Sequence, residues 1–381
     1  MSVNRSIKFY CGIIIAAATC WAGTVAAEFN LNMTRGATET SQMVYDLHMQ
    51  ALWMVTIIGA AVFGVMIYSL VNHRKSKGAV PAKFHHSTRL EIIWTLIPIL
   101  ILVVFSYPAT KTLITMEETA DADMTIKITG YQWKWRYDYL DEDFGFFSTL
   151  APSSNEARQL KSGVDVKTIE NYLLDVDNPV VIPVNRKIRL ITTANDVIHS
   201  WWVPDLGWKR DAIPGFINDN WTMISEPGTY RGQCAELCGK DHAFMPIVVK
   251  AVPEQEYSNW VEQMKVALAE SAAGVDREWS MAELIERGQQ VYNTTCVACH
   301  QANGQGLPPA FPPLTGSPIA TGPISEHINV VLHGRPGTTM QAFGDQLNAV
   351  ELAAVITYER NALGNKVGDM VQPSDIKSAQ Q

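Results

Sequence analysis

Residues 232–245 read Gly-Gln-Cys234-Ala-Glu236-Leu-Cys238-Gly-Lys-Asp-His242-Ala-Phe-Met245, and His199 precedes them. Thiolate, thioether and imidazole together form the donor set that selects copper. A mononuclear blue-copper site uses one cysteine, so the second cysteine indicates two copper ions bridged by two thiolates. Zinc, which has no need for the methionine, and a disulfide stay open as alternatives. The spacing favours copper over both.

The residues around this stretch predict β-structure from 113 to about 260. Met124–Gly130 alternates apolar and polar residues, and Met245–Val252 is a β-branched run. Glycine and proline punctuate these runs, as they do in a β-sandwich. Residues 141–175 carry weaker signals and are interpreted as an insertion or hairpin. We therefore predict one soluble β-domain over 113–260.

Two apolar segments precede this domain. No charged residue occurs from Leu47 to Asn72 or from Ile92 to Thr110, and each segment is about long enough to cross a bilayer. The basic loop His73–Lys77 between them belongs on the cytoplasmic side, which places everything after Lys111 outside the cytoplasm. We predict a transmembrane hairpin within residues 28–112, with helices at about 47–72 and 91–110.

The N-terminus has the pattern of a secretory signal. Arg5 and Lys8 precede an apolar run, and small residues lead up to Ala27. We predict a signal peptide over 1–27 with cleavage after Ala27. An uncleaved helix and lipidation at Cys20 are the alternatives, and both fit the pattern less well.

A second motif, Cys296-Val-Ala-Cys299-His300, is a c-type haem attachment sequence. Two thioether bonds would hold the porphyrin, with His300 as the proximal iron ligand. A chance match, a redox pair or a zinc site is the alternative, but export of the chain favours haem. Met281–Tyr292 is predicted to be an amphipathic helix with a Ser280–Glu283 capping box, and Asn348–Leu363 a second amphipathic helix.

The distal haem ligand is predicted to be Met340, in Gly337-Thr-Thr-Met340-Gln-Ala-Phe-Gly. His327 and His333 are rival ligands, which we interpret as surface or haem-edge residues. Ligation by histidine and methionine raises the haem potential and leaves no open position for oxygen. This pattern favours electron carriage over gas binding.

Chain length and net charge narrow the number of domains and the class of partner. A chain of 381 residues suggests two or three domains. A net charge of −8, with basic residues clustered in one short loop, argues against nucleic acid as a partner and suits a basic protein. We predict a helical linker over 261–280, a small helical domain over 281–366 and a disordered tail over 367–381.

The chain resembles cytochrome c oxidase subunit II from the first apolar segment to about Trp260. The resemblance rests on residues 232–245 and on four further segments in the same order and spacing: Leu90-Glu91-Ile-Ile-Trp94-Thr, Gly130-Tyr-Gln-Trp133-Lys-Trp135, Asp196-Val-Ile-His199-Ser-Trp and Asp211-Ala-Ile-Pro-Gly. The C-terminal part resembles class I cytochromes c, including the proline-rich loop at 304–316. Together they resemble the fusion found in caa3-type haem-copper oxidases. The implied fold is multidomain: a two-helix transmembrane hairpin, a cupredoxin β-sandwich or barrel, and a small all-α cytochrome domain.

The resemblance also assigns roles to residues. It implies a dinuclear copper centre, CuA, which Glu236 binds through its backbone carbonyl while its carboxylate reaches a magnesium ion at the interface with subunit I. Trp133 resembles the residue where electrons enter, and Glu91 a glutamate at the mouth of a proton pathway. Without the resemblance, packing and a helix-end charge would explain these two. The implied side-chain ligands of CuA are His199, Cys234, Cys238, His242 and Met245.

The implied function is electron entry into a respiratory oxidase. Electrons would pass from an external donor through covalent haem c and CuA to subunit I, where oxygen is reduced to water with proton pumping. Subunits I and III, the bacterial inner membrane, and cytochrome c or another periplasmic donor are the implied partners. Asp196 and the acidic stretch Asp138–Asp143 are candidate docking residues for that donor.

Two positions depart from the family pattern: Tyr131 replaces a frequent histidine, and Gln341 a common proline. A quinol-oxidising subunit II lacks the copper ligands, which are complete here. A carrier that feeds another reductase, such as one for nitrogen oxides, and a subunit with vestigial metal sites are the other readings. The hairpin, Glu91 and the full ligand sets favour the oxidase.

Overall fold

The computed structural model describes residues 32–81, 83, 85–159 and 162–380. The predicted signal peptide and its cleavage site lie outside these residues. The chain divides into two units, Met1–Thr34 and Arg35–Gln381, and the contacts described below belong to the second unit.

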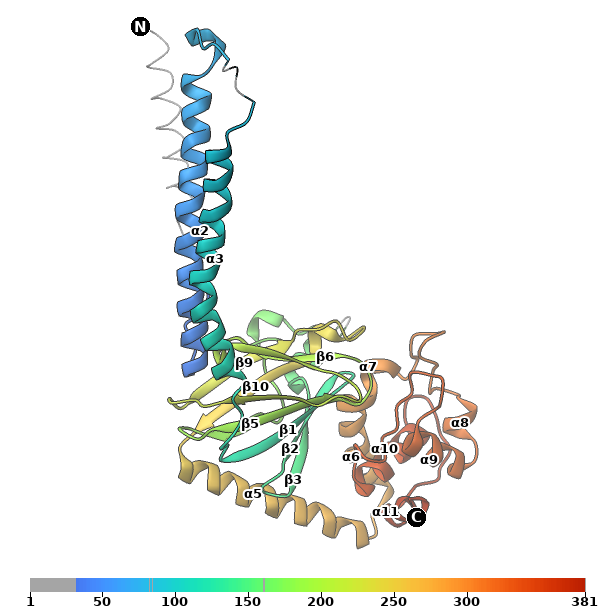
Figure 1. The fold of residues 1–381 in the computed structure, drawn as a ribbon. Helices are drawn as coiled ribbons and strands as arrows, with labels where there is room; N and C mark the ends of the chain where they lie inside the picture. The colour runs from blue at the N-terminus through green and yellow to red at the C-terminus, as the bar shows by residue number, and fades with distance from the viewer. Residues whose placement is uncertain (1–31, 82, 84, 160–161, 381) are drawn as a thin grey trace. The chain divides into compact units, whose positions relative to one another are not determined.

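Two long helices form the predicted hairpin. Helices α2 (Glu39–Asn72) and α3 (Thr88–Glu117) run side by side, and both are long and apolar enough to cross a membrane (Figure 1). At 1.5 Å per residue, the 34 residues of α2 span about 51 Å, more than a hydrocarbon core of about 30 Å. The helix therefore begins before the apolar segment, at Thr38, whose side chain caps it by accepting from the Ser41 amide. The Thr38 hydroxyl donates to the Leu206 carbonyl at 3.1 Å, which ties this end of the helix to the β-domain.

The predicted β-sandwich is confirmed as two five-stranded sheets. The first sheet has the order β3-β2-β1-β5-β8, with β1 parallel to β5 and antiparallel to β2. The second has the order β4-β10-β9-β6-β7, with β10 parallel to β4 and antiparallel to β9. The strands are β1 (Met124–Tyr131), β2 (Lys134–Tyr139), β3 (Phe144–Ser148), β4 (Val180–Pro183), β5 (Ile188–Ala194), β6 (His199–Val203), β7 (Trp208–Ala212), β8 (Asn218–Thr222), β9 (Gly228–Cys234) and β10 (Pro246–Val252).

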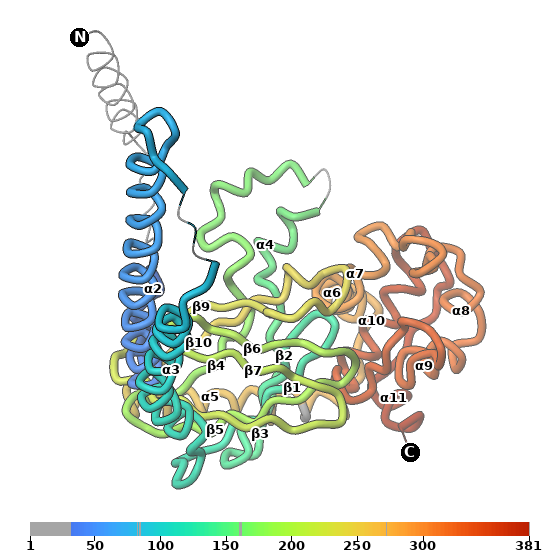
Figure 2. Tube along the Cα trace, turned by 45° about the horizontal axis from the view of Figure 1, so that its top comes forward, coloured from blue at the N-terminus to red at the C-terminus, as the bar shows by residue number. Residues whose placement is uncertain are grey.

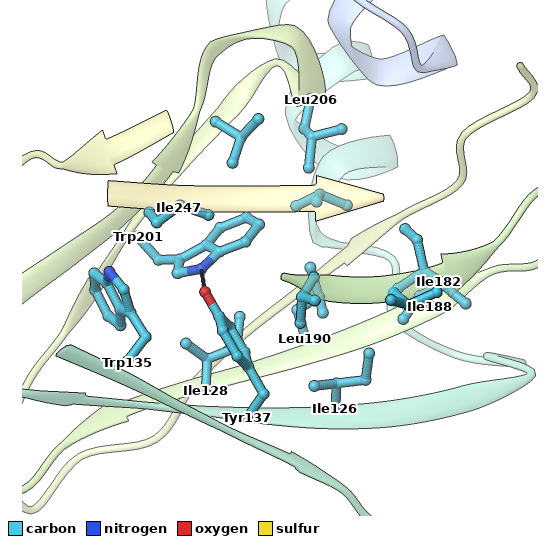
Figure 3. Close-up of a cluster of buried hydrophobic side chains, with 14 of the residues drawn as sticks. Ile126, Ile128, Trp135, Tyr137, Ile182, Ile188, Leu190, Trp201, Leu206 and Ile247 are labelled. Atoms are coloured by element: carbon cyan, nitrogen blue, oxygen red, sulfur yellow. Dashed lines mark hydrogen bonds between the residues drawn. The ribbon is translucent and has the colours of Figure 1, made fainter. Parts of the chain in front are cut away.

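Alternation of apolar residues builds the core between the sheets. Ile126 and Ile128 of β1 are fully buried, and Lys127 between them is partly exposed. Each buried side chain of this size contributes about 1.5–3 kcal/mol relative to exposure. The Trp201 indole donates to the Tyr137 hydroxyl at 3.2 Å inside this core, so its one polar atom is satisfied (Figure 3).

The weakly patterned segment 141–175 contributes strand β3 and the short helix α4 (Pro152–Ala157). Strand β3 extends the first sheet by pairing with β2. The residue after α4, Arg158, reaches the copper-binding stretch, as described below.

The C-terminal helices follow a 20-residue helix, α5 (Glu254–Ala273). They gather around α10 (Figure 2). The predicted capping box is confirmed: Ser280 accepts from the Glu283 amide and Glu283 from the Ser280 amide. The helices are α6 (Met281–Val291), α7 (Val297–His300), α8 (Pro318–Thr321), α9 (Ile324–His333), α10 (Ala349–Asn361) and α11 (Pro373–Ala379).

Two predictions for this region are wrong. Helix α10 is not amphipathic but buried on nearly all sides, because its polar residues find partners inside. Arg360, 1% exposed, makes a two-pronged ion pair with Asp369 at 2.6 Å for each bond. The predicted disordered tail instead forms α11, whose Ile376 is buried in the same core as Val371.

Close packing of α6 on α10 depends on Gly288. A Cβ atom there would lie 2.1 Å from the Ala354 carbonyl oxygen, a backbone atom that cannot move alone. We expect Gly288→Ala to destabilise the helical domain by about 1–3 kcal/mol, measured by thermal unfolding. Gly274→Ala, whose Cβ meets nothing closer than 3.5 Å, is the control. Equal melting temperatures for the two variants would contradict the packing argument.

Candidate copper and haem sites

The sandwich brings the copper-binding stretch together with the distant His199. His199 begins β6, Cys234 ends β9 and Met245 immediately precedes β10. Because β6 pairs with β9 (Trp201 opposite Cys234) and β9 with β10, all three residues lie at the same end of the second sheet. The strand pairing thus brings His199 next to the copper-binding stretch, although the two are far apart in the sequence.

All six predicted copper-binding residues meet at this end. His199, Cys234 and Cys238 offer ligand atoms within 4.8 Å of one another. The Cys238 sulfur lies 3.4 Å from His242 Nδ1 and 3.5 Å from Met245 Sδ. The Glu236 backbone carbonyl lies 3.4 Å from the Cys234 sulfur. Two thiolates, two imidazoles, a thioether and a carbonyl fit soft copper ions better than zinc.

The two thiols are not joined. Their sulfurs lie 3.9 Å apart, whereas a disulfide bond measures about 2.05 Å. Hydrogen bonds with Cys238 and His199 lower the pKa of Cys234. The pKa of Cys238 shifts the other way, because its hydrogen bond with Cys234 and its burial both raise it. One thiolate is therefore available at neutral pH, and thiolates are the form that binds metal.

Neighbouring side chains orient the histidines and the loop. Asp196 Oδ1 lies 2.8 Å from His199 Nε2, which leaves Nδ1 facing the Cys234 sulfur at 4.0 Å. Burial would lower the pKa of His199, but the hydrogen bonds to Asp196 and Cys234 outweigh it and raise that pKa. A carboxylate on the far nitrogen fixes the ring of a metal-binding histidine.

The loop itself is held by a buried ion pair. Arg158 donates to Asp241, beside His242, at 3.1 Å, and the Asp241 side chain is 4% exposed. The same guanidinium lies 4.3 Å from the centre of the Phe244 ring. Segment 141–175, interpreted from its sequence as an insertion or hairpin, thus helps to position the metal-binding loop.

Gly130 leaves room for His199. A Cβ atom at Gly130 would lie 2.7 Å from His199 Cδ2, and this ring is fully buried. We expect Gly130→Ala to displace the ring and to lower copper affinity roughly 10- to 100-fold, the usual cost of disturbing the surroundings of a ligand. Copper retention during dialysis against a chelator measures this effect.

A matched glycine provides the control for that variant. The Cβ atom of Gly228→Ala would meet the Tyr230 hydroxyl at 3.1 Å, the far end of a side chain that can move. This variant should retain copper as the unmodified chain does. Copper retention by Gly130→Ala equal to that of the control would show that the site tolerates the displaced ring.

The predicted haem residues line one large cavity. Its volume is about 610 Å³, and its lining includes Cys296, Cys299, His300 and Met340. His300 Nδ1 donates to the Pro312 carbonyl at 3.2 Å, which leaves Nε2 free for iron. Burial raises the pKa of Cys296 and brings that of Cys299 to about 11, so both are thiols, unlike Cys234. The volume and the donor set fit a covalent haem.

The rival histidines lie in different surroundings. His333 is exposed. His327 lines the cavity and is 2% exposed, so it is not a surface residue. Its Nε2 lies 2.8 Å from Glu359 Oε2, also buried, and this pairing competes with iron binding. Met340, which lines the same cavity, stays the predicted distal ligand.

Trp133 lies between the two sites. Its indole donates to the Cys238 carbonyl at 3.2 Å, and the residue also lines the haem cavity. Glu91 lies elsewhere, exposed in the first turn of α3. The structure thus groups Trp133, but not Glu91, with the metal-binding residues.

Sequence reasoning missed Lys134. Its ammonium lies 4.4 Å from the centre of the Phe147 ring and 5.5 Å from that of Phe343, in the wall of the haem cavity. Burial lowers its pKa to about 8. The only sequence signal was the position of Lys134 between two tryptophans, Trp133 and Trp135.

The fold and the two sites define a protein with two membrane-length helices, a cupredoxin-like copper-site domain and a helical domain with a haem-sized cavity. Comparison with known families agrees. Residues 124–252 match the model for cytochrome c oxidase subunit II, periplasmic domain, and residues 26–112 the model for its transmembrane domain. Residues 283–358 match the model for cytochrome c oxidase, cbb3-type, subunit III.

The chain belongs to the cytochrome c oxidase subunit II family. It is 38% identical over 262 residues to a Rickettsia bellii chain named "Probable cytochrome c oxidase subunit 2", covering 68% of this chain and 93% of that one. It is 37% identical to cytochrome c oxidase subunit 2 of Cereibacter sphaeroides, over 59% of this chain and 78% of that one. The solved periplasmic domain of subunit II from Bradyrhizobium japonicum is 44% identical and covers 39% of this chain and 98% of its own, with a TM-score of 0.34.

Proposed function

We propose that this chain is the electron-entry subunit of a bacterial respiratory oxidase, receiving electrons from a periplasmic donor at haem c and passing them through CuA to subunit I. The observation that carries the proposal is the pair of complete ligand sets in one exported chain. Copper and haem of these types supply one-electron chemistry without an open position for oxygen. Oxygen reduction to water and proton pumping therefore belong to subunit I.

The chain's own residues would hold and tune these groups. His199, Cys234, Cys238, His242 and Met245 would bind copper with their side chains, and Glu236 with its carbonyl. Cys296 and Cys299 would carry the porphyrin, and His300 and Met340 would bind its iron. Trp133, in contact with the copper loop and the haem cavity, is the proposed point where electrons enter the copper domain.

The membrane part completes the proposal. Helices α2 and α3 would anchor the chain in the inner membrane against subunits I and III, with both metal domains outside. Glu91 would lie near a proton pathway, and the exposed Glu236 carboxylate would reach magnesium at the interface with subunit I. Domain limits of 1–27, 28–112, 113–260, 261–280 and 281–366 remain part of this proposal.

Purification of the tagged full chain from membranes tests the proposal. We expect a haem-bearing large subunit to accompany it, oxygen uptake with a reduced donor, and an electron paramagnetic resonance signal from one electron shared by two coppers. A single-copper signal, or zinc in place of copper, would overturn the CuA assignment. Turnover of nitrogen oxides without oxygen uptake would overturn the oxidase assignment.

A further inference from the structure

Several polar contacts join the helical domain, residues 281–366, to the β-sandwich. Asn155 Nδ2 donates to the Asn293 carbonyl at 2.8 Å. Lys240, in the copper loop, donates to the Ala298 carbonyl, in the middle of the haem-attachment motif. Gln341 Nε2 donates to Asp196 Oδ2 at 3.1 Å. Each contact lies at the cavity that holds the haem residues.

The Gln341 contact continues as far as a copper ligand. Asp196 Oδ2 also accepts from the Gln132 amide at 2.7 Å, and Asp196 Oδ1 lies 2.8 Å from His199 Nε2. Gln341 directly follows Met340 in the chain. A short path of bonds and hydrogen bonds therefore runs from the haem ligand Met340, through the Gln341 amide and the Asp196 carboxylate, to His199.

The residue type at position 341 makes this path possible. Position 341 is a glutamine, and a residue without a side-chain amide could not make this contact. A glutamine amide offers two donor hydrogens, and a carboxylate is its stronger acceptor because a charged partner roughly doubles the strength of a hydrogen bond. Gln346 supports the side chain from behind, with Nε2 at 3.5 Å from Gln341 Oε1.

We propose that Gln341 is a positioning residue that holds the haem domain against the copper site for electron transfer within the chain. This inference rests on the proposed function. In the step that it serves, one electron leaves ferrous haem c and enters oxidised CuA; no bond is formed or broken and no proton moves. Gln341 touches neither group and acts through Asp196 and the docked arrangement.

A second consequence concerns the external donor. Asp196, a candidate docking residue for that donor, is already engaged by the chain's own haem domain through Gln341. The donor must then deliver its electron to the haem domain and not to the copper face. Gln341 thereby separates the surface that receives electrons from the surface that passes them on.

Gln341→Glu in the full chain, within the purified oxidase, tests the proposal. A carboxylate at this position cannot donate and repels Asp196. We expect electron transfer from photoreduced haem c to CuA to slow about tenfold, equivalent to about 1.4 kcal/mol of docking free energy. Hydrogen exchange should also increase at residues 130–133 and 337–344. Gln289→Glu, an exposed glutamine on α6, brings the same charge change and should alter neither.

The outcomes distinguish failure of the Gln341 proposal from failure of the proposed function on which it rests. The unmodified oxidase must first show the shared-electron copper signal and the methionine-ligated haem; their absence overturns the proposed function. With both present, an unchanged transfer rate overturns the role of Gln341, and so does a slower rate without faster exchange. Where the glutamate disturbs the haem spectrum, Gln341→Leu replaces it, because leucine removes the donor without adding charge.

Discussion

Cys234→Ser should abolish the dinuclear copper centre while leaving haem c in place. The serine hydroxyl is similar in size to the thiol, but it remains protonated at neutral pH and is a poor ligand for copper. Cys234 is 6% exposed and lies in contact distance of His199, Cys238 and the Glu236 carbonyl, so no other side chain can replace it. Of the two cysteines in this loop, Cys234 is the one whose pKa is lowered.

The measurement combines copper content per haem with electron paramagnetic resonance. The shared-electron signal should disappear, and oxygen uptake driven by a reduced donor should fall to background. Covalent haem, detected on a denaturing gel, is the internal control because Cys296 and Cys299 are unchanged. Retention of the shared-electron signal would mean that one thiolate suffices, and the bridging role of Cys234 would be lost.

Met340→Leu should convert the haem from methionine-ligated to open or water-ligated, and lower its potential on the order of 0.1 V. Leucine fills similar volume without a sulfur donor, so the packing of the cavity changes little. Electron entry from the donor should fall with the potential, whereas the copper signal should be unaffected. Spectroscopy of the ferric haem and a redox titration record both effects.

The rival histidines supply the controls for this variant. His333→Asn changes an exposed residue and should leave the haem spectrum intact. His327→Gln changes a cavity residue that is paired to Glu359, and should also keep the methionine-ligated spectrum, although the domain loses stability. Loss of that spectrum in His327→Gln alone, with Met340→Leu unchanged, would transfer the distal role to His327.

Local motifs predicted much of both sites. The spacing from Cys234 to Met245 places those ligands in a single loop, and a c-type attachment sequence identifies its own iron ligand. His199 was a candidate as a histidine that precedes the loop, and the resemblance implied that it is a ligand; the pairing of β6 with β9 is what brings it to the loop. Gly130, Arg158 and Lys134 act through contacts across the fold, which no local pattern encodes.

The helical domain shows a second limit of sequence reasoning. Glu359 and Arg360 looked like the polar face of an amphipathic helix, yet both are buried with partners outside the helix. A buried charge with a partner and an exposed charge have the same sequence pattern, so periodicity could not distinguish them. The tail was predicted disordered because it is short and aperiodic, but Val371 and Ile376 suffice to pack it on α10.

The shared wall of the haem cavity bears on how the protein is assembled. Trp133, Lys134 and Gly239 of the sandwich line the cavity together with the haem-attachment residues. A porphyrin therefore enters most easily while the helical domain stands away from the sandwich. Biogenesis would then have an order, with haem attachment first and docking second, and α5 would serve as the tether that keeps the unfinished domain close to its final position.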